Sequence, residues 1–140
     1  MTITTRSEFE TLTAAAEFAR TLRPGDVVAL FGDLGAGKTA FVRGMATGRG
    51  YTGRVTSPTF NLVHVYDCVP PLYHYDLYRI NGAEEMEEQG YYDALENGAI
   101  LALEWAERIE TALPPGYIRV TLTRDNSDDE SRDITMEVTS

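Results

Sequence analysis

The residues most suited to chemistry lie in one stretch, Gly32-Asp33-Leu34-Gly35-Ala36-Gly37-Lys38-Thr39. It matches the pattern G-x-x-x-x-G-K-[ST], in which backbone N–H groups surround phosphate oxygens and the lysine neutralises them. Eleven of the twelve basic residues are arginines, and the one lysine, Lys38, supplies the compact ammonium that suits a phosphate site. We therefore expect a nucleoside triphosphate site formed by Asp33, Leu34, Gly35, Ala36, Gly37, Lys38, Thr39 and Ala40.

The flanking sequence predicts the strand and the helix that such a loop requires. Residues 27–31 form a continuous apolar run, which is typical of a strand buried on both faces. Residues 39–46 favour a helix, although Gly44 weakens it. A helix that begins at the loop points its unpaired N–H groups and the positive end of its dipole at a bound phosphate.

Phosphoryl chemistry also needs a magnesium ion and a residue that orients the nucleophile. Thr39 follows the lysine, where a hydroxyl can bind the metal. Glu104 comes directly after an apolar run at 99–103, and ligands of open α/β sheets lie beyond the carboxyl ends of the strands. Asp76, at the end of a predicted strand at 72–77, is the second acidic candidate, although an aspartate there can also cap a turn. The predicted catalytic residues are Lys38, Asp76 and Glu104, and the predicted metal ligands are Thr39, Asp76 and Glu104.

Further polar side chains lie outside these positions. Ser57, Pro58 and Thr59 form a loop where nucleotide-dependent switch loops occur, but an ordinary turn is an equal interpretation. His64 and His74 lie on predicted strands, and we interpret them as packed or exposed residues rather than as ligands.

The amino-terminal half supplies a further helix and a hairpin. Residues 7–10 fit a capping box and predict a helix to about Leu22. Its predicted inner face carries Phe9, Leu12, Ala16 and Ala19. Predicted strands at 60–66 and 72–77 are joined by a short turn and should therefore pair antiparallel, which makes the sheet mixed.

The carboxy-terminal part predicts a second hairpin at the sheet edge, with strands at 117–123 and 131–138 and a mobile polar loop at 124–130. Together the elements predict an α/β, three-layer fold of the P-loop NTPase type with a mixed, mostly parallel central sheet. At 140 residues the chain has room for one domain, which we place at residues 1–140.

Composition limits the function classes. The net charge of −10 argues against direct binding to a nucleic-acid backbone, so any nucleic acid in the process would be contacted only through partners. A single cysteine and the lack of a long apolar segment favour a cytoplasmic protein with no membrane contact.

Several motifs in this order resemble the TsaE family. They are the loop at 32–39, Ser57-Pro58-Thr59-Phe60-Asn61-Leu62-Val63, His74-Tyr75-Asp76-Leu77-Tyr78-Arg79, and Glu104-Trp105 followed by Leu113-Pro114. The resemblance covers essentially the whole chain. It implies a small bacterial P-loop ATPase that works with TsaB and TsaD in threonylcarbamoyladenosine modification of tRNA.

The resemblance also implies roles for individual residues. Magnesium would be held at Thr39 and Glu104 with Asp76 close by, and Ser57–Phe60 would act as a switch loop. The nucleotide base would lie near Glu8 and near Ser131-Arg132.

Other functions remain open from the residues alone. The phosphate loop permits a small-molecule or nucleoside kinase, although the chain leaves little room for an acceptor pocket and a lid. A GTPase is disfavoured because neither N-K-x-D nor D-x-x-G occurs. A nucleotide-gated binding module without hydrolysis is the third alternative.

Overall fold

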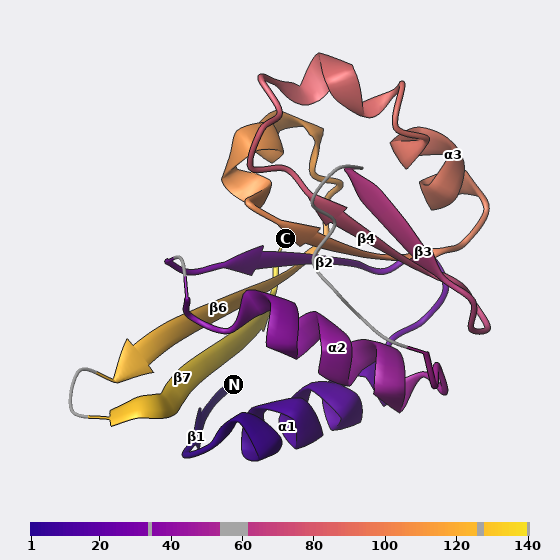
Figure 1. Cartoon of the computed structure of the whole chain (residues 1–140). Helices are drawn as coiled ribbons and strands as arrows, with labels where there is room; N and C mark the ends of the chain where they lie inside the picture. The colour runs from indigo at the N-terminus through magenta and orange to yellow at the C-terminus, as the bar shows by residue number, and fades with distance from the viewer. Residues whose placement is uncertain (34, 54–61, 126–127, 140) are drawn as a thin grey trace.

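The computed structural model describes residues 1–33, 35–53, 62–125 and 128–139. In these ranges the centre of the molecule is a seven-stranded sheet (Figure 1). Its strands are β1 (Thr2–Thr5), β2 (Val27–Phe31), β3 (Val63–Tyr66), β4 (Leu72–Asp76), β5 (Ile100–Glu104), β6 (Ile118–Asp125) and β7 (Asp128–Val138). They run in the order β1-β7-β6-β2-β5-β4-β3. The four neighbours β6, β2, β5 and β4 are parallel, whereas β3, β7 and β1 pair antiparallel, which confirms the mixed sheet.

Helices cover both faces of this sheet (Figure 1). One face carries α1 (Glu8–Arg20) and α2 (Lys38–Gly48), and the other carries α3 (Tyr91–Glu96) and the short 3-10 helices η1 (Ala83–Met86) and η2 (Ala106–Ala112). Alternate residues of β2 serve the two cores. Val28 and Leu30 pack with α1 and α2, whereas Ala29 and Phe31 pack on the side of α3. The predicted three-layer α/β fold is therefore confirmed.

The two long helices pack closely because α2 has glycines where they meet. A Cβ on Gly44 would lie 2.5 Å from the backbone oxygen of Leu12 in α1. Gly44, which has a low intrinsic preference for a helix, lets the backbone of α1 approach α2 closely. This contact fixes α2, and with it the phosphate loop, against the rest of the molecule.

The amino-terminal helix begins where predicted, and Ala19 is buried as expected, but the rest of its buried row differs from the prediction. Ser7 caps it, because its side-chain oxygen accepts a hydrogen bond from the Glu10 N–H at 3.1 Å. The expected inner position of Phe9 is wrong, since its side chain is 76% exposed. Thr11 starts the buried row, which continues four residues apart at Ala15 and Ala19, and a residue two positions from that row points to the opposite side of a helix.

The carboxy-terminal hairpin differs from its prediction in two respects. It does not form the outermost edge, because β1 pairs antiparallel with β7 and covers it. The polar segment 124–130, expected to be a mobile loop, lies largely in β6 and β7. Arg124 on one strand forms an ion pair of 3.1 Å with Asp129 on the other, so charges in this segment pair across the hairpin.

No helix in the described part of the chain is both long and apolar enough to cross a bilayer.

Candidate functional site

The phosphate loop connects the end of β2 to the start of α2. Gly32 and Gly37 have φ values of +146° and +100°, which other residues rarely adopt. A Cβ on Gly32 would also lie 2.5 Å from the backbone oxygen of Leu122 in β6. The Ala36 N–H donates to the Asp33 carbonyl at 3.0 Å, which tightens the turn. These constraints explain the glycines of the sequence motif.

The side chain of Lys38 lies at the mouth of this loop and is 6% exposed. Its Nζ donates to the Gly32 carbonyl at 2.7 Å and lies 3.9 Å from the centroid of the Trp105 ring. Trp105 follows β5 directly and has a left-handed backbone, with φ of 61°. The ammonium is therefore held by a carbonyl and an aromatic face, neither of which neutralises its charge.

Two predicted metal ligands meet beside this lysine. The Thr39 hydroxyl donates to both oxygens of Glu104, at 3.2 and 3.3 Å. β2 and β5 are parallel neighbours, with Leu30 opposite Glu104, so the carboxyl end of β5 lies next to the start of the loop. Glu104 is only 4% exposed. The structure thus places a buried carboxylate within reach of the helix that carries the loop.

His74 also belongs to this site, and our interpretation from the sequence missed that role. Its Nε2 lies 2.5 Å from Glu104 Oε2, and its ring is fully buried. Because an ionised carboxylate only accepts, Nε2 is the donor in this contact. His74 and Asp76 are two residues apart on the predicted strand and therefore lie on the same face of it. That spacing was the available signal that His74 lies near the site. The distance along the chain hid the rest, since Glu104 follows thirty residues later.

Asp76 lies at the edge of the same site. It stands opposite Glu104 in the register of β4 and β5. Its Oδ1 accepts a hydrogen bond from the Tyr78 N–H at 3.1 Å. Asp76 therefore caps a turn, as one of the two sequence interpretations held, and it lies next to Glu104 on the neighbouring strand.

The donor set fits magnesium. Thr39 and Glu104 offer hard oxygen atoms, and Mg²⁺ in phosphate sites is typically held by one or two side chains, with phosphate and water oxygens completing its shell. The described residues contain no group of three or more His, Cys, Asp or Glu side chains that could hold a metal alone. A site completed by a bound nucleotide agrees with both observations.

A cavity of about 170 Å³ opens on the other side of the loop. It is lined by Glu8, Thr11, Gly37, Ala40, Asp129, Glu130 and Arg132. The start of α1 and the carboxy-terminal hairpin thus meet beside the phosphate loop, although they lie at opposite ends of the chain.

Some predicted positions are placed less informatively. Asp33 and Gly35 are exposed at the outer rim of the loop. Leu34 and the predicted switch residues Ser57, Pro58 and Thr59 lie outside the described residues. His64, on β3, is half-buried and packs edge-on against the ring of Tyr66.

Comparison with known proteins agrees with the motifs. The family model for threonylcarbamoyl adenosine biosynthesis protein TsaE matches residues 5–134. The TsaE protein of Rickettsia typhi is 46% identical over 123 residues, covering 85% of this chain and 83% of that protein. The TsaE protein of Bacillus subtilis is 42% identical over 127 residues, covering 90% and 78%. The crystal structure of Bacillus subtilis YdiB superposes with a TM-score of 0.82 at 37% identity, covering all of this chain and 86% of that one. The chain therefore belongs to the TsaE family.

Proposed function

We propose that this protein binds ATP with magnesium and hydrolyses it slowly as part of tRNA threonylcarbamoyladenosine biosynthesis. The pathway follows from membership of the TsaE family. The observation that carries the ATPase is the contact of Thr39 and Glu104 directly beside the Lys38 ammonium. A phosphate loop alone serves many functions, whereas a buried carboxylate against its threonine suits metal-dependent phosphoryl chemistry.

Binding begins with the phosphate loop. Its backbone N–H groups and the amino-terminal end of α2 favour an anion. Lys38 exchanges its hydrogen bond to the Gly32 carbonyl for phosphate oxygens, which compensate its charge better than a neutral carbonyl does. Burial of this ammonium strengthens the attraction because water screens it less.

Thr39 and Glu104 hold the metal, and Asp76 supports it through water. Magnesium, when bound, offsets the negative charge of the phosphates. Glu104 also orients the attacking water, and His74 keeps its carboxylate in place through the Nε2–H donor. The oxygen of the water bonds to the γ-phosphorus while the bond between that phosphorus and the oxygen bridging it to the β-phosphate breaks. ADP and inorganic phosphate leave, and the proton lost by the water passes to solvent.

We expect slow turnover because arginines beside the loop are already bonded to other groups of the chain. Two guanidinium groups beside the loop, those of Arg124 and Arg132, are bonded to Asp129 and to main-chain carbonyls. A cation for the γ-phosphate would then come from a partner, as it does when an arginine is supplied in trans. TsaB and TsaD are the proposed partners, and tRNA is contacted through them in the cytoplasm, since the net charge is −10.

The test is the release of ADP and phosphate by the purified protein, with and without TsaB and TsaD, in magnesium and in EDTA. We expect slow magnesium-dependent turnover that rises when both partners are added. ATP binding without turnover under all these conditions would favour a nucleotide-gated binding module. Transfer of phosphate to a small molecule would favour a kinase.

A further inference from the structure

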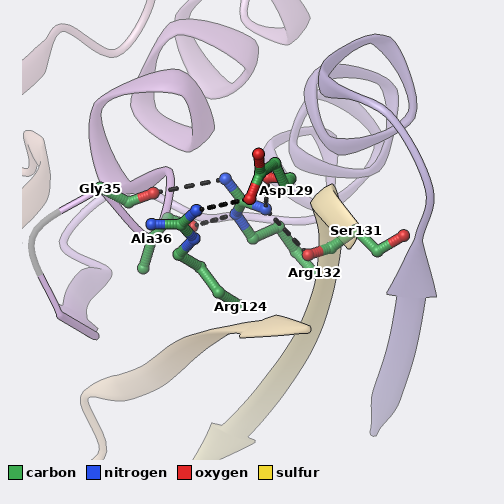
Figure 2. A network of polar contacts seen from close by, with 6 residues as sticks. All are labelled: Gly35, Ala36, Arg124, Asp129, Ser131 and Arg132. Atoms are coloured by element: carbon green, nitrogen blue, oxygen red, sulfur yellow. Dashed lines mark hydrogen bonds and ion pairs between the residues drawn. The ribbon is translucent and has the colours of Figure 1, made fainter. Parts of the chain in front are cut away.

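The side chain of Arg132, on β7 of the carboxy-terminal hairpin, forms hydrogen bonds with the phosphate loop (Figure 2). Its Nε donates to the Ala36 carbonyl at 2.9 Å and its Nη2 to the Gly35 carbonyl at 3.3 Å. Its Nη1 donates to the carbonyls of Asp129 and Ser131, at 2.5 and 2.8 Å. All three guanidinium nitrogens are thus used on main-chain oxygens, and two of those oxygens belong to the loop.

Because the peptide bond is planar, a hydrogen bond to a loop carbonyl also fixes the direction of the N–H in the same peptide. In a trans peptide the C=O and the following N–H point in opposite directions. The Gly35–Ala36 peptide is held from both ends, because its N–H donates to Asp33 while its oxygen accepts from Arg132. The next peptide is held at its Ala36 oxygen only. Its Gly37 N–H has no hydrogen-bond partner among the described residues and faces away from Arg132.

We propose that Arg132 is a positioning residue that orients the Gly37 N–H toward bound phosphate. This inference rests on the proposed ATP site and deepens it. Lys38, Thr39 and Glu104 recognise the phosphates and metal with side chains, whereas Arg132 acts only through the backbone of the loop. Since Arg132 also lines the cavity beside the loop, the hairpin that shapes that cavity sets the loop conformation as well.

The chain offers a matched control for the charge of this residue. Arg124 stands directly opposite Arg132 in the register of β6 and β7. Its guanidinium forms an exposed ion pair with Asp129 rather than a bond to a loop carbonyl. Loss of either arginine removes the same charge from the same end of the hairpin. A difference in ligand affinity between the two variants would therefore come from the hydrogen bonds of Arg132 to the loop and not from its charge.

The experiment is calorimetric titration of ATP and of tripolyphosphate, both with magnesium, into the parent, Arg132→Lys, Arg132→Gln and Arg124→Gln. Tripolyphosphate tests the loop without the base. We expect both Arg132 variants to bind both ligands about tenfold more weakly, the loss expected for one charge-assisted hydrogen bond. Arg132→Lys should not restore binding, because one ammonium cannot reproduce the fork that meets two adjacent carbonyls. Arg124→Gln should bind within about twofold of the parent, as an exposed ion pair contributes little.

Several results would overturn the inference. Parental affinity in Arg132→Lys would show that only charge matters, and equal losses in Arg124→Gln and Arg132→Gln would show the same. A loss confined to ATP would place Arg132 in base recognition instead. Thermal melting identifies any variant that does not fold. If Arg132→Gln does not fold, the affinity of Arg132→Lys, the milder change, decides the test. A parent protein that binds neither ligand would refute the proposed function itself, which is a separate outcome.

Discussion

The two sides of the phosphate loop are built on different principles. The acid side is formed by Lys38, Thr39, His74 and Glu104. There the side chains of Thr39 and His74 bond the buried Glu104 carboxylate directly, and the Lys38 ammonium lies against the Gly32 carbonyl and the Trp105 ring. On the hairpin side, formed by Gly35, Ala36 and Arg132, a guanidinium bonds main-chain carbonyls at the rim of the loop. The first arrangement suits chemistry on a ligand, and the second suits control of the backbone. The comparison predicts that acid-side changes affect ATP binding, turnover or both, whereas hairpin-side changes affect phosphate affinity alone.

The largest effect is expected for Lys38→Ala on the acid side. It removes the buried ammonium beside Gly32 and Trp105, and ATP affinity should fall about thousandfold, or roughly 4 kcal/mol. Calorimetric titration measures this, with circular dichroism as the control for folding. Near-parental affinity would mean that ATP binds somewhere other than the phosphate loop.

Glu104→Gln should separate turnover from binding. The amide keeps the shape of the side chain but loses the charge that holds metal and orients water. We expect hydrolysis to fall about hundredfold, or roughly 2.7 kcal/mol, while ATP affinity stays within about tenfold. Steady-state phosphate release and calorimetry measure the two quantities. If the variant hydrolyses ATP like the parent, Glu104 is structural and Asp76 becomes the leading acid.

A pair of His74 variants tests whether the acid side depends on one hydrogen bond. Glutamine can place an N–H near the position of His74 Nε2, whereas leucine cannot. We expect His74→Leu to lower kcat about tenfold and to lower the melting temperature, since a buried carboxylate loses a donor. His74→Gln should restore most of the kcat. Equal rates in both variants would limit His74 to packing.

The smallest effect concerns Trp105, the only tryptophan of the chain. Its ring contacts the Lys38 ammonium, which should leave the ring when phosphate binds. Addition of ATP with magnesium should therefore produce a saturable change in tryptophan emission, larger than with ADP. Lys38→Ala should show no change. Constant emission at saturating ATP would show that Lys38 keeps its contact with the indole in the complex.

Elements with a strong local pattern were predicted well. The apolar runs around Val28 and Leu101 became central parallel strands, and Ser7 caps its helix as the capping box indicated. Predictions that depended on which surface an element meets were weaker. Phe9 was assigned to the wrong face of α1, and the charged segment at 124–130 was expected to be a loop because its cross-hairpin ion pair cannot be seen from sequence.

The sequence by itself determined the phosphate loop, its lysine and threonine, and the acid after the apolar strand. These are local patterns, because a glycine-rich turn between a strand and a helix fixes its own geometry. Only the tertiary structure decided that His74 forms a hydrogen bond with Glu104 and that Arg132 forms hydrogen bonds with the carbonyls of the loop. Both contacts depend on strand order and register. These bring His74 to Glu104, 30 positions away, and Arg132 to Ala36, 96 positions away. No local pattern encodes such a pairing, since many sheet orders satisfy the same alternation of apolar and polar residues.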